Sequence, residues 1–252
     1  MPVITIRELP TMGRRGNQLF LYCFAKGYAL HHRCELQVPD WWGRKVFVNA
    51  QEPLITVHLP QTELDGFSSK RLGYFFGQTG IDINVFGQHQ CYLDYYTRTY
   101  VREWLKLKPE WEQYAPRSIY SAMHIRRGDY LHTGHRDHYC EISEASYARA
   151  IEQFQIPQPV IRVSEETSVM PLDWPDPSLA WLPDFLILRN AAYLLRANST
   201  FSWWAGTLGY GQVYSPFVHT KVGLHDVDFV PGNHENTAGV FPNQSDLNLK
   251  ES

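Results

Sequence analysis

The chain has 252 residues, 44% of them hydrophobic and 19% charged, a composition typical of a globular protein with one large domain or two smaller ones. A net charge of −3 argues against a basic, nucleic-acid-binding surface. No stretch approaches the ~20 apolar residues of a membrane-spanning helix, and no secretory signal is visible. We therefore expect a soluble, cytoplasmic protein whose four cysteines remain reduced thiols.

The N-terminal part predicts a β-α-β unit. Val3 to Ile6 is strand-like, apolar residues recur at helical spacing from Leu19 to Tyr28, and Cys34 to Val38 predicts a second strand. This order indicates an α/β domain with a parallel sheet. Residues 40–90 show no clear period, and Val101 to Leu107 predicts a helix that ends before Pro109.

The segment from Pro109 to Pro116 is the best candidate linker, so we divide the chain into domains at 1–112 and 113–225 and a polar tail at 226–252. The second domain predicts alternating strands and helices. The strands are expected at Ser118 to Ile125, Val160 to Val163, Arg196 to Asn198 and Val213 to Ser215, and the helices at Ser143 to Phe154, at Asp184 to Leu195 and from Ser202 onward. The expected sheet is parallel and covered on both faces.

Polar and charged residues follow three of these strands. They are His124, Arg126, Arg127 and Asp129 in HIRRGDY, Ser164, Glu165 and Glu166 in SEET, and Asn198, Ser199, Thr200, Phe201 and Ser202 in ANSTFSWW. Ligands of open α/β sheets bind outside the carboxyl ends of the strands. Arginine bonds phosphate bidentately, and hydroxyls and amides at a helix start also bind anionic oxygens. Together these residues predict a pyrophosphate site.

The adjacent Arg126 and Arg127 are expected to point to opposite faces of a strand, so only one can enter a given pocket. A simpler interpretation of this segment is an ion pair between Arg127 and Asp129 on the surface, worth ~0 to 1 kcal/mol. The RGD tripeptide also occurs in cell-adhesion ligands, but the lack of a secretion signal gives that interpretation little support.

Five potential metal ligands lie close together in the segment LHTGHRDHYCE: His132, His135, Asp137, His138 and Cys140. Zinc sites need defined spacings such as paired CxxC units or HExxH on a helix, and this run has neither. The spacing favours a surface loop, and we expect no metal site.

Five segments together resemble the α-1,2-fucosyltransferases of glycosyltransferase family 11. They are GRRGNQLFLYCFAKGYAL (13–30), HIRRGDY (124–130), HYCEISEASYARAI (138–151), VIRVSEE (160–166) and ANSTFSWWAG (197–206). They occur in the family's order along most of the chain. Arg15 replaces the leucine usual in the first segment.

The resemblance implies a GT-B-like α/β architecture, in which two Rossmann-type domains with parallel sheets face an interdomain cleft. Residues 1–112 would form the acceptor-side domain and 113–225 the GDP-sugar-binding domain. The implied reaction is transfer of fucose from GDP-fucose, with inversion, to a hydroxyl of a galactose-type oligosaccharide in α-1,2 linkage. The resemblance implies neither a cofactor nor a metal, and it leaves the oligomeric state open.

The same resemblance suggests roles for individual residues. Arg126 would hold the β-phosphate of GDP and act in catalysis, His124 would line the donor pocket, and Ser199 to Ser202 would help to bind the phosphates. Glu165 and Glu166 would recognise guanosine. The residues expected on the interdomain or acceptor side are Gly13, Arg14, Gly16, Asn17 and Gln18.

Two departures leave alternatives open. Glu165 and Glu166 are each one methylene longer than the aspartates usual in the family, and the segment 167–183 is shorter and richer in proline than expected. The chain could therefore use another nucleotide sugar, or it could be a non-catalytic nucleotide-sugar- or carbohydrate-binding protein. The general base, for which Asp129, Asp94 and the acidic pair are candidates, is not identified.

Overall fold

The computed structural model describes residues 1–62, 75–128, 139–165, 171, 173–218 and 222–234. The described residues divide into two compact units, one up to Lys108 and the other from Pro109 onward. Of the residues singled out above, Asp129, Glu166, His132, His135, Asp137 and His138 lie outside the described residues.

The first unit has a three-stranded parallel sheet in the order β2-β1-β3. Its strands are β1 (Val3–Thr5), β2 (Glu35–Gln37) and β3 (Ile81–Asp82), and helix α1 (Arg15–His32) connects the first two. The β-α-β unit predicted from the sequence is thus confirmed. Helix α1 ends at His32 because the next residue, Arg33, has a left-handed backbone with a φ of 53°.

Aromatic side chains fill the core of this unit. Phe20, Phe24 and Tyr28 from α1 are fully buried, as are Phe75 and Tyr92. Phe24 packs with ring centroids 4.7 Å from Tyr92 and 6.2 Å from Phe75, and the hydroxyl of Tyr28 donates to the Phe75 carbonyl (3.1 Å). These rings tie α1 to the segments for which the sequence has no readable period.

A fully buried carboxylate, Asp82, ends β3. It accepts hydrogen bonds from the Thr5 hydroxyl (2.6 Å), from the backbone N–H and Nε of Arg7 (2.9 and 3.0 Å) and from the Gln61 amide (3.1 Å). The buried charge is therefore fully hydrogen-bonded, as burial of an ion requires. It joins the carboxyl ends of β1 and β3.

The described part of the first unit also contains a 3-10 helix, Leu9–Thr11, and three short α-helices: α2 (Gly43–Val46), α3 (Gln90–Leu93) and α4 (Arg98–Trp104). Helix α4 begins and ends three residues before the helix predicted at Val101 to Leu107. The hydroxyl of Thr97 accepts a hydrogen bond from the Tyr100 N–H and starts the helix there, a cap that apolar spacing does not reveal.

The second unit contains a five-stranded sheet in the order β10-β8-β7-β4-β6. Strands β4 (Ser121–Ile125), β6 (Val160–Ser164), β7 (Tyr193–Leu195) and β8 (Gln212–Pro216) are parallel, and β10 (Phe229–Pro231) is antiparallel to β8. A separate parallel pair joins β5 (Cys140–Ile142) to β9 (Gly223–His225).

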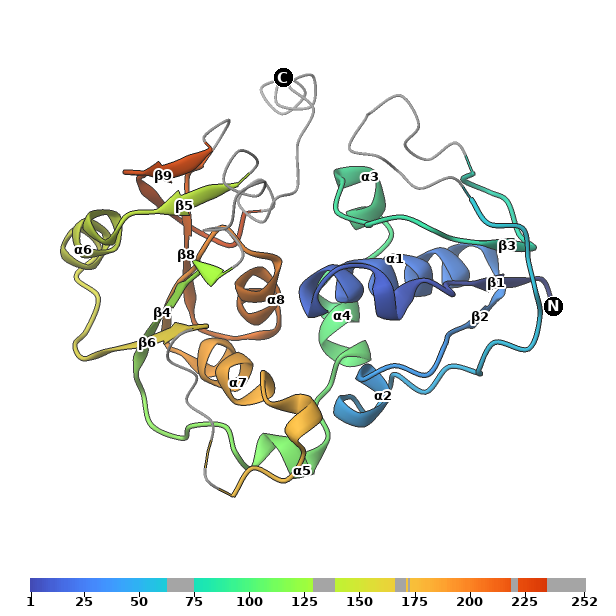
Figure 1. Cartoon of the computed structure of the whole chain (residues 1–252), viewed down its shortest axis with the longest axis horizontal. Coiled ribbons are helices and arrows are strands. Elements are labelled where there is room, and N and C mark those ends of the chain that lie inside the picture. Colours follow the sequence, from blue (N-terminus) through green and yellow to red (C-terminus); the bar gives the residue numbers. More distant parts are fainter. Residues whose placement is uncertain (63–74, 129–138, 166–170, 172, 219–221, 235–252) are drawn as a thin grey trace. The chain divides into compact units, whose positions relative to one another are not determined.

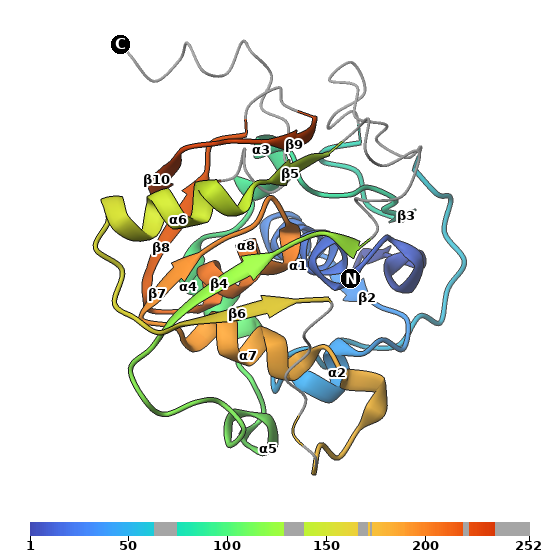
Figure 2. The same cartoon turned by 60° about the vertical axis from the view of Figure 1, so that its left-hand side comes forward.

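Helices cover both faces of this sheet, as Figure 1 and Figure 2 show. Helix α6 (Glu144–Gln153) lies on one face, and α7 (Leu182–Asn190) and α8 (Thr200–Leu208) lie on the other. The prediction of Ser143 as the cap of α6 is confirmed, because its hydroxyl accepts a hydrogen bond from the Ser146 N–H (3.2 Å). Tyr147 and Ala150 of α6 pack into the same core cluster as Ile125 and Leu195 of the sheet.

Several boundaries predicted for this unit are wrong. The expected linker begins with a short helix, α5 (Pro109–Glu112), and the expected helix from Asp184 to Leu195 ends at Asn190. The last three residues of that expected helix form β7 instead. The strand expected at Arg196 to Asn198 therefore lies three residues earlier, at Tyr193–Leu195. Strand β10 falls within the expected tail, and the pairing of β5 with β9 was not predicted.

Candidate functional site

Strand register brings the first two candidate segments together at the carboxyl edge of the five-stranded sheet. Ile125, the last residue of β4, pairs with Ser164, the last residue of β6, so the residues that follow them are neighbours. Arg126 and Glu165 accordingly form an ion pair, and the Arg126 side chain is only 12% exposed. Glu165 thus contacts the residue expected to act in catalysis, and its expected role in recognising guanosine stays a prediction.

Gly128 makes room for this ion pair. Its φ of +23° is unusual for a residue with a side chain, and a Cβ atom built there would overlap the carboxylate of Glu165. The positive φ favours glycine at this turn, and a larger residue there would also have to displace the end of the Glu165 side chain from Arg126.

Arg127 points away from Arg126, as expected for adjacent residues. Its Nη2 donates to Glu144 (2.8 Å) and its Nε lies 3.4 Å from Glu141. Arg162 contacts the same Glu144 carboxylate. These contacts direct Arg127 toward α6 and β5. Its expected pairing with Asp129 involves a residue outside the described ranges, and its expected role in donor binding stays a prediction.

His124, in β4, is the buried neutral group of the site. It is 4% exposed, its Nδ1 has no hydrogen-bond partner within the described residues, and its ring centroid lies 5.7 Å from that of Phe201. Burial, and next the guanidinium groups of Arg126 and Arg196, lower the pKa of His124 to about 3. The imidazole is therefore neutral near pH 7 and can form a new hydrogen bond with a ligand.

Sequence reasoning missed Arg196, which follows β7 and is fully buried. Its guanidinium donates to the Asn233 side-chain oxygen (2.5 Å) and to the His234 carbonyl (3.4 Å). Asn233 in turn donates to the Trp203 carbonyl and the Thr207 hydroxyl of α8 (2.9 and 2.8 Å). The sequence feature that could have indicated Arg196 is its position, as a charged residue directly after the apolar Tyr193-Leu194-Leu195.

The third candidate segment forms the start of α8. Ser199 caps the helix by accepting a hydrogen bond from the Phe201 N–H (3.2 Å), and Asn198 is also buried. Ser202 was expected to contact phosphate but is fully buried, and its hydroxyl donates to the carbonyls of Ala197 and Ser199. Partly buried Thr200 and the helix amides near it are the groups of this segment that an anion can still reach.

Phe201 anchors that helix start. Its ring lies 5.4 Å from Phe185 and 6.1 Å from Trp181, as well as against His124. This packing fixes the position of His124 relative to the start of α8. The expected contact of Phe201 with the donor stays a prediction. Ser164, 7% exposed, closes the edge from β6.

The N-terminal candidates surround the start of α1. Gly13, with a φ of +64°, forms the turn, Arg14 is exposed, Asn17 is partly buried and Gly16 is buried. Gln18 was expected on the acceptor side, but its amide is used internally. It donates to the carbonyls of Pro10 and Gly13 (2.9 and 3.0 Å) and accepts from the Trp42 indole (2.6 Å).

Three further features bear on the type of site. The described residues contain no group of three or more His, Cys, Asp or Glu side chains able to hold a metal ion. All four cysteines lie in described segments, and none of them forms a disulfide. No helix in the described ranges combines the length and apolar character that crossing a membrane requires.

Comparison with known proteins identifies similar structures but no similar sequence. No protein-family model matches the chain, and neither does any curated protein. A crystal structure of NodZ α-1,6-fucosyltransferase soaked with GDP-fucose is 15% identical, with a TM-score of 0.51, and the match covers 92% of this chain and 99% of that one. Fucosyltransferase NodZ from Bradyrhizobium is 14% identical, also with a TM-score of 0.51, over 91% and 98% of the two chains.

This similarity concerns the fold. The chain has an α/β fold with parallel sheets, similar to the GT-B fold of the NodZ structures, which confirms the fold class predicted from the sequence.

Proposed function

We propose that this protein is an inverting glycosyltransferase that moves fucose from GDP-fucose to a sugar hydroxyl. The observation that carries the proposal is the cluster at the carboxyl edge of the five-stranded sheet, where Arg126, neutral His124 and the start of α8 lie next to one another. Nucleotides bind at this edge in parallel α/β folds. The similar fold of NodZ and the resemblance of five sequence segments support the same activity.

The proposed chemistry is substitution at the anomeric carbon of fucose. The acceptor hydroxyl oxygen forms a bond to that carbon while the bond to the GDP oxygen breaks, through an oxocarbenium-like transition state, and the hydroxyl proton is released to solvent as the new bond forms. Negative charge grows on the departing pyrophosphate, and Arg126 would stabilise it. Neutral His124 would hydrogen-bond the donor without adding a charge of its own.

The Arg126–Glu165 ion pair imposes a condition on donor binding. A phosphate that takes the bidentate face of Arg126 must compete with the Glu165 carboxylate. In the GDP-bound enzyme, Glu165 would then be released toward the rest of the nucleotide. Its movement would couple phosphate binding to base recognition.

The acceptor and linkage form the finer part of the proposal. The five-segment resemblance supports α-1,2 transfer to a galactose-type acceptor, whereas the NodZ structures belong to an α-1,6-fucosyltransferase. Domain 1–112 would bind the acceptor, and domain 113–225 would bind GDP-fucose.

A second candidate is a protein of the same fold that uses another nucleotide sugar or only binds one. The contact of Glu165 with Arg126 favours it, because this carboxylate neutralises the cation that a departing pyrophosphate would need.

Donor turnover tests these candidates. GDP release would be measured from GDP-fucose and from other purine-nucleotide sugars, with galactose-terminated oligosaccharides, in the presence and absence of EDTA. We expect turnover of GDP-fucose that survives EDTA and an α-1,2 product by NMR. Binding of GDP without turnover on the whole acceptor panel would favour the binding protein, and turnover of another donor alone would favour the different transferase.

A further inference from the structure

A pocket of about 470 Å³ lies at the amino edge of the five-stranded sheet, opposite to the edge that carries Arg126. Its residues precede β4, connect α7 to β7 and connect α8 to β8. They are Ile119, Arg189, Asn190, Ala191, Ala192, Tyr193, Tyr210, Gly211 and Gln212. The volume falls within the roughly 300–1,000 Å³ of small-molecule sites.

The floor of the pocket is backbone held in place by hydrogen bonds. The Ala192 N–H donates to the Tyr120 carbonyl (2.9 Å), and the Gln212 N–H donates to the Ala192 carbonyl (2.8 Å). A Cβ atom at Gly211 would collide with the carbonyls of Ala191 and Ala192. The floor is therefore formed before a ligand binds, so less conformational entropy is lost on binding.

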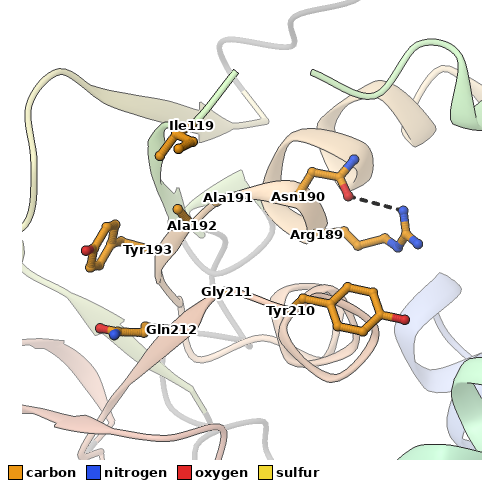
Figure 3. A pocket seen from close by; sticks show the side chains of 9 residues that line it. All are labelled: Ile119, Arg189, Asn190, Ala191, Ala192, Tyr193, Tyr210, Gly211 and Gln212. Atoms are coloured by element: carbon orange, nitrogen blue, oxygen red, sulfur yellow. Dashed lines mark hydrogen bonds between the residues drawn. The ribbon is translucent and has the colours of Figure 1, made fainter. Parts of the chain in front are cut away.

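Side chains rise on both sides of this floor. Figure 3 shows Tyr193 and Gln212 on one side of the Ala192 and Gly211 backbone, and Arg189, Asn190 and Tyr210 on the other. Tyr210 is 81% exposed and Ile119 is 90% exposed, so two large apolar side chains stand in water at the rim. An exposed aromatic ring offers a face on which the C–H face of a sugar ring can stack.

Two amide side chains of the pocket are oriented by hydrogen bonds to their oxygens. The Asn190 side-chain oxygen accepts from Arg189 (3.2 Å), and the Gln212 side-chain oxygen accepts from the Tyr214 hydroxyl (3.0 Å). Their amide nitrogens make no hydrogen bond within the described segments, so each presents two N–H groups to a ligand. Both are donors suited to hydroxyl or ether oxygens.

The charge of the pocket is compensated. Among the described residues that line it, Arg189 is the only charged one, and it bonds both oxygens of Glu112 (2.9 and 3.1 Å). An anion would have to displace that carboxylate, whereas a neutral ligand leaves the pair intact. The best-fitting ligand is therefore neutral, rich in oxygen and partly apolar on one face.

We propose that this pocket is a carbohydrate-binding site, distinct from the candidate donor site, which takes a neutral oligosaccharide with a ring stacked on Tyr210 and its oxygens bonded by Asn190 and Gln212. It would hold one part of a glycan away from the edge where transfer is proposed. The inference does not depend on the proposed transfer, because a chain that only binds sugars could use the same pocket.

Saturation-transfer NMR and titration calorimetry would test this site on the full chain with saturating GDP. The probes are lactose and a galactose-terminated tetrasaccharide, with glycerol as the non-sugar polyol. Binding in the millimolar range is expected for the sugars, and Tyr210→Ala should weaken it about tenfold and Gln212→Ala about threefold. Tyr100→Ala, which removes another exposed tyrosine, should leave it unchanged.

The two sites are distinguished by Arg126→Ala. This change should lower the rate of transfer by ~10² to 10³ but leave sugar binding at the pocket intact, so the failure of one proposal does not imply failure of the other. Because galactose-terminated sugars are also the proposed acceptors, maltose and maltotetraose, which lack galactose, are tested in parallel. Binding of these sugars that survives both Tyr210→Ala and Gln212→Ala, or no sugar binding stronger than that of glycerol, would overturn the assignment.

Discussion

The carboxyl ends of the parallel strands carry opposite charges in the two units. In the first unit, the buried carboxylate of Asp82 bonds to Thr5, Arg7 and Gln61. In the second unit, two guanidinium groups flank a buried imidazole whose Nδ1 makes no bond within the described part of the chain. At this edge of the sheet, the first unit therefore has a carboxylate whose hydrogen bonds are all made within the protein. The second unit has a cationic edge with an imidazole nitrogen that can still bind a ligand.

The largest effect is expected on the turnover rate when the positive charge of Arg126 is removed. If Arg126 stabilises the leaving pyrophosphate, Arg126→Ala should lower the turnover rate with GDP-fucose by ~10² to 10³ while the melting temperature changes little. Arg149→Ala, which removes an exposed arginine of α6, is the matched control and should keep normal turnover. Near-normal turnover in Arg126→Ala would remove Arg126 from the mechanism.

Removing the hydrogen-bonded carboxylate of Asp82 should lower the stability of the fold and not the rate of the proposed reaction. Asp82→Ala removes four hydrogen bonds and leaves Arg7 without its carboxylate, which should lower the free energy of unfolding by about 3 kcal/mol. Urea unfolding would measure it. Asp40→Ala, at a carboxylate that is 90% exposed, should cost less than about 1 kcal/mol; equal effects of the two changes would show that the Asp82 contacts add little.

The buried imidazole makes stability depend on pH. In the folded chain His124 stays neutral down to a pH of about 3, whereas in the unfolded chain it takes up a proton below about 6.5, so protonation favours unfolding as the pH falls. Between these values its contribution should decrease by about 1.4 kcal/mol per pH unit.

Unfolding titrations at pH 7, 6 and 5 would measure this slope. His124→Gln should reduce it, whereas His225→Gln, at an exposed histidine, should not. An unchanged slope in His124→Gln would mean that another group causes the acid sensitivity.

The smallest effect concerns the competition for Arg126. Glu165→Gln removes the anionic partner of Arg126, so GDP should bind more tightly by up to about fivefold, the range of a partly exposed ion pair. Glu152→Gln, on the exposed face of α6, is the control for a lost negative charge. Weaker binding of GDP by Glu165→Gln would mean that Glu165 helps to bind the nucleotide directly.

Local patterns predicted much of the fold because they act over a few residues. The helical spacing from Leu19 to Tyr28 and the cap at Ser143 gave α1 and α6. Strand β7 was absorbed into a predicted helix because Ala191 to Leu195 continues the apolar run of α7, and only pairing with β4 and β8 makes it a strand.

The candidate site was predictable in composition but not in contacts. Three strand ends identified Arg126, His124 and Ser199 as neighbours. The partner of Arg126 depends on the register of β4 against β6, and the use of the Gln18 amide depends on a loop and on Trp42, which no local pattern encodes. Burial of Arg196 depends on Asn233, 37 residues later in the chain.

Asn233 has a consequence for the order in which the protein is completed. The ribosome makes β4, β6, β7 and α8 before it reaches this residue, which then contacts Arg196 and the carbonyl and hydroxyl groups of α8. A nascent chain that has not yet emerged to residue 233 can pair the parallel strands but lacks this link between β7 and α8. Chains truncated after Gly232 and after His234 should therefore differ in how well α8 is ordered, although neither lacks any of the residues proposed to contact the donor.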